Sequence, residues 1–340
     1  MASRMLDEAR EAPAAVARQL AADGESVRAF GASLRADPPS SILTLGRGSS
    51  DHAAHHAAYL VMARLGRLVT SLPMSVVTLY GARIEARGLA CLAFSQSGQS
   101  PDLVEPARDF TARGARTAAF VNDAASPLAA ASRHVFALHA GEEASVAATK
   151  SFIAQLVAGA RLVAAWQGDD DLARALLRLP EALERSSRPS ADAAVEALAG
   201  ADRLLVVGRG TGLAIALEAA LKLKETCGLQ AEAFSGAELR HGPLALVDEG
   251  YPVIVFAPRG PAQPGLLATA RDLASRGARV LLVAPEGTPG THVGFVPTAD
   301  EALDPCCAIQ AFYPVAEALS RARGRDPDRP PHLAKVTRTH

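Results

Sequence analysis

Two halves of the sequence repeat one another. Segment 42–60 reads ILTLGRGSSDHAAHHAAYL, and segment 204–222 reads LLVVGRGTGLAIALEAALK. Each is a short apolar run followed by Gly-Arg-Gly, a hydroxyl residue and a helical pattern. At the same separation of 162 positions, with one residue inserted partway, segment 89–123 matches segment 251–286, and both contain the peptide RGAR. Two matched blocks in the same order predict a tandem duplication, which restricts the chain to folds built from two similar units.

Each repeat is typical of a parallel α/β domain. The order strand–loop–helix–strand–loop–helix–strand fits both copies, and strands such as LACLAF and PVIVFA are apolar throughout. Continuous apolar strands indicate a parallel sheet with helices over both faces. We therefore expect the α/β class, with two tandem, doubly wound parallel sheets flanked by helices. The expected parts are an N-terminal helical segment (1–40), a first domain (41–165), a helical connector (166–200), a second domain (201–325) and a C-terminal tail or lid (326–340).

Composition excludes several classes of partner. The chain of 340 residues has 35 basic and 36 acidic side chains and only 4% aromatic residues, so neither a basic stripe nor a stacking surface for nucleic acid is expected. Apolar runs are too short to span a bilayer, and the N-terminal MASRMLDEAREAP has acids where a signal peptide needs an apolar core. The cysteines lack disulfide and metal spacing. We expect a cytoplasmic protein with no nucleic-acid or membrane partner.

A polar loop follows the apolar strand at 89–94. Its residues are Ser95, Gln96, Ser97, Gly98, Gln99 and Ser100, and a helix begins near Pro101. Three hydroxyls, a glycine and a helix N-terminus favour binding of an anion, such as the phosphate of a small metabolite. The equivalent loop at 257–261 has no hydroxyl and two prolines without N–H donors, so one phosphate site per chain is expected. In the GRGSS peptide, Ser49 and Ser50 either bind sugar hydroxyls or act as helix caps.

A second polar cluster lies in segment 218–248. Lys222 and Glu225 are three residues apart and share a helix face, and His241 follows in a turn bounded by glycine and proline. A carboxylate that moves a proton between adjacent carbons, with a histidine that opens a ring, suits sugar isomerisation. A helix ion pair with a structural histidine is an equal interpretation of the spacing. The histidines at 52, 55 and 56 have no further ligand at metal spacing, so no metal or other cofactor is expected.

Lysine is scarce in this sequence. Only four of the 35 basic residues are lysine, namely Lys150, Lys222, Lys224 and Lys335, although arginine is abundant. Because arginine cannot supply an amine that loses its proton or forms a Schiff base, the four lysines are either candidates for chemistry or simple remnants.

Several motifs together resemble one known family. They are SQSGQSPD (95–102), SVAATKSFIAQL (145–156), ALEAALKLKE (216–225), AEAFSGAELRHGPLALVD (231–248) and the C-terminal HLAKVTRTH. The combination is similar to the isomerase part of glucosamine-6-phosphate synthase, a family of paired sugar isomerase (SIS) domains. The tail DPDRPPHLAKVT is similar to that of the stand-alone SIS-type glucosamine-6-phosphate deaminases. The match extends over nearly the whole chain.

The resemblance implies binding roles at the matched positions. It implies that the sugar phosphate is held by Ser95, Gln96, Ser97 and Ser100. It implies that the sugar is lined by Ser49, Ser50, Val146 and Ala334.

Catalytic roles are implied in the same way. Glu225 matches the isomerising base, and Lys222 matches its neighbour in the same helix. His241 matches a ring-opening histidine that the family supplies from the neighbouring subunit, which implies a homodimer with a shared active site. Lys335 matches a tail lysine that forms a Schiff base with a keto sugar, and the tail would act as a movable lid.

One departure from the synthase sets the expected reaction. The synthase carries a glutaminase domain that begins with a nucleophilic cysteine, whereas this sequence begins MASRM, about forty residues before the first GRGSS. Without a captive source of ammonia, we expect hydrolysis of glucosamine 6-phosphate to fructose 6-phosphate and ammonia. The alternatives are a deglycase acting on an adduct of a sugar phosphate with an amino acid, a simple aldose–ketose isomerase, ammonia-dependent synthesis of glucosamine 6-phosphate, and a non-catalytic sensor of a sugar phosphate.

Overall fold

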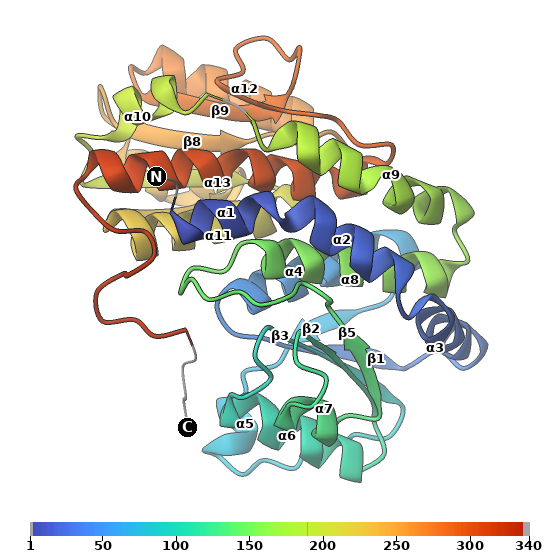
Figure 1. Cartoon of the computed structure of the whole chain (residues 1–340). Helices are drawn as coiled ribbons and strands as arrows, with labels where there is room; N and C mark the ends of the chain where they lie inside the picture. Colours follow the sequence, from blue (N-terminus) through green and yellow to red (C-terminus); the bar gives the residue numbers. More distant parts are fainter. Residues whose placement is uncertain (1–2, 189, 336–340) are drawn as a thin grey trace. The chain divides into compact units, whose positions relative to one another are not determined.

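The computed structural model describes residues 3–188 and 190–335. Within these residues the strands form two five-stranded sheets, and every neighbouring pair of strands is parallel. Figure 1 shows both sheets with their flanking helices. The prediction of an α/β fold with two doubly wound parallel sheets is confirmed.

The two sheets have the same topology. The first has the order β2-β1-β3-β4-β5, and the second has the order β10-β9-β8-β6-β7. The strands of the first are β1 (Ser41–Leu45), β2 (Val69–Ser71), β3 (Leu89–Ser95), β4 (Arg116–Val121) and β5 (His134–Ala137). Those of the second are β6 (Arg203–Gly208), β7 (Gln230–Ser235), β8 (Pro252–Phe256), β9 (Arg279–Pro285) and β10 (Val293–Phe295). Strands β6 to β10 thus repeat β1 to β5 one for one, as a duplication requires. In each sheet the strand order reverses beside the first strand, and ligands of open α/β sheets bind at the carboxyl ends of the strands there.

Helices precede, follow and alternate with these strands. They are α1 (Arg4–Arg10), α2 (Ala12–Ala21), α3 (Gly24–Ala36), α4 (Ser49–Leu65), α5 (Ser75–Thr78), α6 (Pro101–Ala112), α7 (Pro127–Ala131), α8 (Lys150–Gln167), α9 (Asp170–Ser186), α10 (Asp192–Leu198), α11 (Thr211–Cys227), α12 (Gln263–Ser275) and α13 (Asp304–Ala322). Short 3-10 helices are found at η1 (Glu238–His241), η2 (Pro243–Leu246) and η3 (Glu301–Leu303).

Alternating side chains of the first sheet face different helices, because successive residues of a strand point to opposite faces. On one face, Leu43 of β1 shares a buried cluster with Phe110 of α6. On the other face, the ring of Phe120 in β4 stacks on that of Phe136 in β5 at 5.3 Å, and Phe136 contacts Phe30 of α3 at 5.5 Å between ring centroids. Both faces of this sheet are therefore covered, with α6 on one side and α3 on the other (Figure 1).

The second sheet is covered in the same manner. Val255 of β8 belongs to a buried cluster with Leu266 and Leu273 of α12. The next residue, Phe256, points to the opposite face and meets Phe312 of α13 edge-on at 5.5 Å between centroids. The apolar strands seen in the sequence are thus buried on both sides, as parallel strands usually are.

The chain forms two compact units. The unit around the first sheet comprises Ala14–Glu143, Lys150–Leu177 and the residues from Ala334 onward. The unit around the second sheet comprises the residues up to Pro13, Ala144–Thr149 and Arg178–Leu333. The domain boundaries expected from the sequence stay a prediction.

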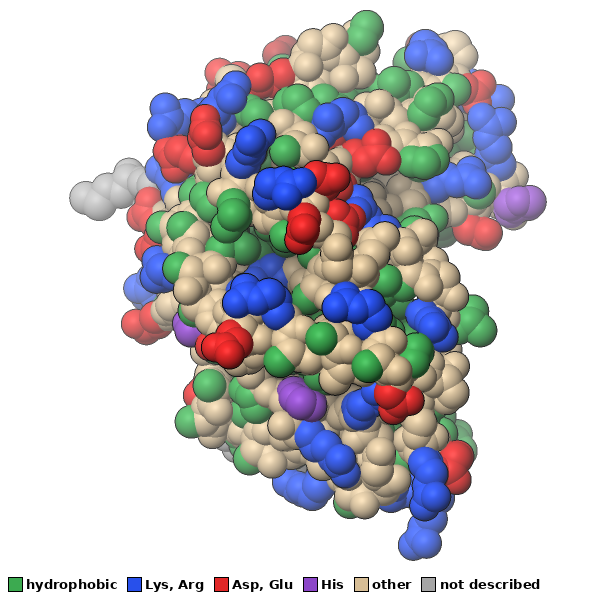
Figure 2. Space-filling view, turned by 90° about the vertical axis from the view of Figure 1, so that its right-hand side faces the viewer, with side chains coloured by type: hydrophobic (Ala, Val, Ile, Leu, Met, Phe, Trp, Pro, Cys, Tyr) green, Lys and Arg blue, Asp and Glu red, His purple; other side chains and the backbone are tan. Residues whose placement is uncertain are grey.

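The distribution of charged and apolar side chains in the structure agrees with the composition of the sequence. On the face shown in Figure 2, basic and acidic side chains are interspersed rather than gathered by sign. No helix among the described residues is long and apolar enough to cross a bilayer. The cysteines Cys91, Cys227, Cys306 and Cys307 are free and buried, as is usual for cysteines that pack like small apolar side chains.

The first glycine of each Gly-Arg-Gly peptide, at or directly after the end of a strand, lies against the helix that follows. A Cβ atom at Gly208 would lie 2.4 Å from the carbonyl oxygen of Gly212, and one at Gly46 would lie 2.7 Å from Cα of Asp51. Backbone atoms cannot move aside as the end of a flexible side chain can. The first glycine of each Gly-Arg-Gly peptide is therefore explained by the close approach of the strand to the following helix.

We expect Gly208→Ala to lower the free energy of unfolding by roughly 1–3 kcal/mol, because the added methyl group overpacks a backbone contact. Urea unfolding followed by circular dichroism measures this change. Gly200→Ala is the matched control, since a Cβ there meets nothing within 4 Å. Equal stability of the two variants would contradict the close-approach explanation.

Candidate functional site

The loop after β3 presents hydroxyl donors. The amide of Gly98 donates to Ser95 Oγ at 2.9 Å, and the amide of Gln99 donates to Ser97 Oγ at 3.3 Å. A hydroxyl that accepts from a neighbouring N–H keeps its own proton to donate to a ligand. Ser100 is the N-cap residue of α6, yet its side chain makes no capping hydrogen bond. The loop can therefore supply hydroxyl donors to an anion beside a helix N-terminus.

The shape of this loop is fixed by Gly98. Its φ of 63° is a left-handed conformation, and an added Cβ would lie 2.2 Å from Ser126 Oγ. The Gly98 carbonyl accepts from the amide of Leu128 at 3.1 Å, and the Gln96 carbonyl accepts from the amide of Asn122 at 3.1 Å. The loop is thus pinned to α7 and to the end of β4 before any ligand arrives, which lowers the entropic cost of binding.

An ion pair joins this loop to the one after β1. Arg47 Nε donates to Asp102 Oδ2 at 2.8 Å, and the Asp102 side chain is only 3% exposed. Asp102 Oδ1 has no hydrogen-bond partner among the described residues. Ser49 and Ser50 form the first turn of α4 in the same region, and Ser50 is 8% exposed. The two predicted loops therefore meet at the switch point of the first sheet.

The equivalent loop of the second sheet is occupied by the protein's own ion pair. Arg259 Nη2 donates to Asp304 Oδ1 at 2.7 Å and to the carbonyl of Thr298 at 2.6 Å. The side-chain hydrogen bonds with Asp304 are the main cause that raises the pKa of Arg259. This guanidinium is committed to Asp304 and to the Thr298 carbonyl, so the loop at 257–261 offers no unpaired arginine to an anion.

Helix α11 carries a buried row of charges. Lys222 Nζ lies 2.5 Å from Glu225 Oε2 and 3.3 Å from Glu218 Oε1. Lys222 and Glu218 are fully buried, and Glu225 is 17% exposed. Burial alone lowers the pKa of Lys222, but the two carboxylates outweigh burial and hold that pKa above its ordinary value. The raised pKa favours the ammonium form of Lys222, which pairs with Glu225, the carboxylate in contact with solvent.

Glu218 is a residue that the sequence interpretation missed. It stands four residues before Lys222 and seven before Glu225, and these spacings place all three on one helix face. The signal was present in ALEAALKLKE, because an i, i+4 pair is as informative as the i, i+3 pair that was recognised.

His241 stands apart from this row. It ends η1, is exposed, and lines a cavity of about 380 Å³ with Arg209 and Arg240. Neither Lys222 nor Glu225 is among the residues that line this cavity. The structure therefore pairs Lys222 with Glu225, whereas His241 lines a cavity to which neither of them contributes.

The tail lysine has a buried partner. Lys335 Nζ donates to Glu143 Oε2 at 2.9 Å, and the Glu143 side chain is fully buried. Glu143 also accepts from the amide of Ser151 at 3.1 Å and from its hydroxyl at 2.5 Å. Ala334, predicted to line the sugar, is exposed beside Lys335, and residues 336–340 of the expected tail lie outside the described residues.

Val146 belongs to a segment that is held by the N-terminal helix. The carboxylate of Glu8 in α1 accepts from the amide of Ala144 at 2.6 Å and from that of Ser145 at 3.2 Å. Val146, the next residue, is half-buried. The buried Glu8 thus fixes the backbone on which this predicted sugar contact lies.

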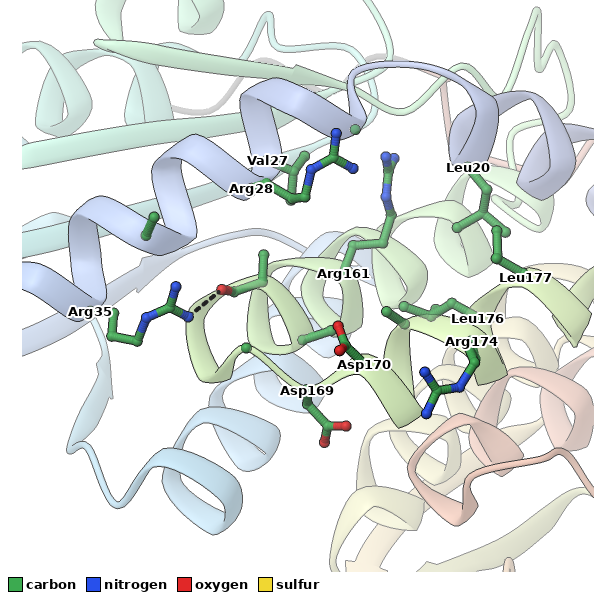
Figure 3. A pocket seen from close by; sticks show the side chains of 16 residues that line it. Leu20, Val27, Arg28, Arg35, Arg161, Asp169, Asp170, Arg174, Leu176 and Leu177 are labelled. Atoms are coloured by element: carbon green, nitrogen blue, oxygen red, sulfur yellow. Dashed lines mark hydrogen bonds between the residues drawn. The ribbon is translucent and has the colours of Figure 1, made fainter.

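A further cavity of about 500 Å³ lies beside α3, α8 and the start of α9 (Figure 3). Two of the arginines that line it donate to carbonyls at helix ends. Arg161 donates to the carbonyls of Gln19 and Ala22 at the end of α2, and Arg35 donates to the carbonyl of Ala165 near the end of α8. Figure 3 shows the last of these bonds as a dashed line. We assign no reaction to this cavity, since these guanidinium groups satisfy carbonyls that a helix leaves unpaired.

Within residues 3–188 and 190–335, no three His, Cys, Asp or Glu side chains lie close enough to hold a metal ion.

Comparison with known proteins identifies the family. The sequence profile of the SIS domain matches residues 37–165 and 197–288. The chain belongs to the SIS domain family. Each matched segment begins shortly before the first strand of one sheet, so the duplicated sequence blocks and the duplicated sheets are two copies of this domain.

Curated relatives of this SIS chain are much longer. A glutamine–fructose-6-phosphate aminotransferase (isomerizing) of Thermus thermophilus is 34% identical over 308 residues, which cover 85% of this chain and 50% of the relative. The enzyme of the same name from Aeropyrum pernix is 36% identical over 314 residues, with 87% and 50% covered. The chain therefore spans about half the length of the curated relatives it matches, and it is related to their isomerase part.

Solved structures agree on the fold. A crystal structure from Silicibacter pomeroyi DSS-3, provisionally described as a phosphosugar isomerase, is 42% identical and superposes with a TM-score of 0.89 over 96% of this chain and 100% of that one. A glucosamine-6-phosphate deaminase from Thermotoga maritima superposes with a TM-score of 0.78 over 99% of this chain and 100% of that one, at 23% identity, which is a likeness of fold. The SIS chain thus has a phosphosugar isomerase fold.

We expect Lys222→Met to lower the free energy of unfolding by about 3–5 kcal/mol, because it leaves the fully buried Glu218 and the partly exposed Glu225 without their cation. In the wild type the pKa of Lys222 is raised, so its contribution is complete below the ordinary lysine pKa and is lost only above it. In the variant, stability should instead recover as the pH falls, because a buried carboxylate without its cation is more stable when it takes up a proton.

Urea unfolding at several pH values measures both effects. Lys224→Met, an exposed lysine on the same helix, is the control and should change stability by less than about 0.5 kcal/mol. A pH-independent loss in Lys222→Met would contradict the ion-pair explanation.

We expect Glu143→Gln to free the tail lysine. The amide still accepts from the Ser151 backbone, but it no longer attracts the Lys335 ammonium, so Lys335 should react several-fold faster with an acetylating reagent. Peptide mass spectrometry measures this rate, and the fully buried Lys222 serves as an internal reference that stays unreacted. Glu142→Gln is the matched control, because Glu142 is the exposed neighbour of Glu143. Equal acetylation of Lys335 in both variants would show that Glu143 does not hold the tail.

Proposed function

We propose that this chain is an enzyme that hydrolyses glucosamine 6-phosphate to fructose 6-phosphate and ammonia. The observation that carries the proposal is the ion pair of Lys222 with Glu225, which holds a partly exposed carboxylate on an otherwise buried helix face. The names of the curated relatives, which are isomerising aminotransferases of fructose 6-phosphate, support the same class of substrate.

In the proposed reaction Glu225 acts on the ring-opened amino sugar. It removes the proton from C2 and returns it to C1, while another proton passes from the amine nitrogen to O1, and the 2-amino aldehyde becomes a ketimine with a hydroxyl at C1. Water then adds to C2, and the C–N bond breaks to release ammonia and leave the ketone of fructose 6-phosphate. Lys222 compensates the charge of the carboxylate before the first proton transfer and after the second.

The remaining roles follow the resemblance. Ser95 and Ser97 donate hydroxyl protons to the phosphate, together with Gln96 and Ser100, and Ser49, Ser50, Val146 and Ala334 contact the sugar. His241 carries a proton between the ring oxygen and O1 during ring opening. We assign this histidine to a second copy of the chain in a homodimer, and its exposed position on η1, outside the row formed with Lys222, supports that assignment.

The contact of Lys335 with Glu143 supports water as the group that attacks C2. An ammonium that donates to a carboxylate has no lone pair, and it cannot form a Schiff base until it loses a proton. Hydrolysis needs no such covalent step. In the proposed reaction Lys335 therefore closes the tail over the sugar rather than bonding to it.

A non-catalytic sensor is less well supported. A sensor needs the phosphate loop but no charge inside α11, and burying an ion costs several kcal/mol of desolvation before pairing returns part of it. The row of Glu218, Lys222 and Glu225 carries that cost on one helix face. Because burying these charges is unfavourable, their presence supports an acid–base function for Glu225, the residue of this row that is in contact with solvent.

Coupled assays of ammonia and fructose 6-phosphate, with glucosamine 6-phosphate as substrate, test the proposal. We expect Glu225→Gln to lower kcat by roughly 10²–10⁴-fold, because the amide cannot carry the proton. Ser97→Ala should mainly raise KM, because it removes a phosphate donor. A Glu225→Gln variant as active as the wild type would contradict the assigned base.

Assays with other substrates distinguish the alternative reactions. A deglycase releases an amino acid from a phosphosugar adduct, an aldose–ketose isomerase interconverts glucose 6-phosphate and fructose 6-phosphate, and a synthase consumes fructose 6-phosphate with ammonium. Turnover of one of these with no ammonia from glucosamine 6-phosphate would overturn the deaminase proposal and retain an enzyme of this fold.

A further inference from the structure

The cavity that contains His241 lies at the ligand-binding edge of the second sheet. Arg209 directly follows β6, and Gly236, Ala237 and Arg240 follow β7, so the carboxyl ends of two adjacent strands meet there. The other wall is the first two turns of α12, from Gly265 to Thr269. Open parallel sheets bind their ligands at this edge. A volume of about 380 Å³ is within the range of small-molecule sites.

The duplication shows what is unusual about Arg209. Its counterpart in the first half is Arg47, which is paired with the buried Asp102 at 2.8 Å. The matching peptides Arg-Asp and RGAR, which lie in and just after α6 and α12, align Asp102 with Gly265. Gly265 and Arg209 line the same cavity, so the second half keeps the arginine but has no carboxylate at the matching position.

The positive charge in this cavity is only weakly compensated. Arg209 is exposed and has no ion-pair partner among the described residues, and none of the described residues that line the cavity is acidic. Arg240 lies 4.0 Å from Asp272, a carboxylate that also pairs with Arg276 at 3.3 Å. Two guanidinium groups and an imidazole thus share one hollow with little opposing charge, and such an arrangement attracts anions.

We infer that this cavity binds a small phosphate-type anion, so that each chain has a second anion site besides the loop at 95–100. Arginine suits this ligand because its planar fork of donors matches phosphate oxygens in pairs. Among the described residues that line the cavity, His241 is the only one with an aromatic side chain, which disfavours a nucleotide base and favours phosphate itself or a compact phosphorylated metabolite. The sequence predicts one phosphate site per chain because the loop at 257–261 has two prolines and no hydroxyl. The proposed second site lies in a neighbouring cavity, outside that loop.

Gly265 provides a sharp test because an added side chain fits there. A Cβ at Gly265 meets nothing within 4 Å. Gly265→Asp restores to the second half the carboxylate that Arg47 has in the first, and this carboxylate should pair with Arg209 and repel phosphate. Gly265→Asn has nearly the same shape without the charge and is the matched control.

The experiment counts phosphate bound per chain, by equilibrium dialysis of radiolabelled inorganic phosphate in low-salt buffer. The Ser95→Ala/Ser97→Ala double variant removes donors of the first site, so that binding at the second can be followed alone. In this background we expect Gly265→Asn to bind phosphate as its parent does, and Gly265→Asp to bind it at least roughly tenfold more weakly. Arg209→Gln should match the aspartate variant, whereas Arg271→Gln, an exposed arginine on α12 outside the cavity, should match the parent.

Each outcome is decisive. Equal binding by Gly265→Asp and Gly265→Asn, or no binding in the double variant, would overturn the inference. Competition by fructose 6-phosphate distinguishes a phosphosugar ligand from inorganic phosphate alone, and circular dichroism checks that every variant is folded. Because the measurement is bound phosphate rather than released ammonia, its result is independent of the proposed reaction.

Discussion

The approach of a strand end to the following helix governs the second half of the chain. Gly208 leaves no room for a side chain against the first turn of α11, so the helix starts at the edge of the sheet. Its next turns then place Glu218, Lys222 and Glu225 along the buried face. The same approach at Gly46 starts α4 at the first sheet and sets Ser49 and Ser50 there. The positions of the polar groups thus follow from backbone packing.

The row on α11 also explains why lysine persists in a chain rich in arginine. An ammonium is a compact donor that fits between two carboxylates separated by seven residues on one helix, whereas a guanidinium is a larger planar fork. Lys150 is almost as buried as Lys222, at 2% exposure. Half of the lysines therefore occupy interior positions where size and donor geometry are restricted, and Lys224 is the one that is plainly exposed.

Much of the architecture could be predicted from the sequence, because repeats, apolar strands and glycine-rich turns are local signals. The pairing of Lys222 with Glu225 could also be predicted, because the two residues are three positions apart on one helix. The partner of Lys335 was not, since Glu143 is 192 positions away and neighbours another glutamate. The ion pair of Arg47 with Asp102 bridges 55 positions and depends on how two loops meet. Contacts of this kind arise only when the sheet is assembled, and no spacing in the sequence encodes them.

The alignment of Asp102 with Gly265 has a consequence for how such a chain can change. Aspartate and glycine codons differ by a single base. In a duplicated gene, one copy can retain the carboxylate and keep its loops joined, while the other exchanges it for glycine and leaves a guanidinium open to solvent. In a second copy of a stable domain, one point mutation can thus convert a buried ion pair into an exposed arginine. The other copy keeps its own ion pair and is unaffected.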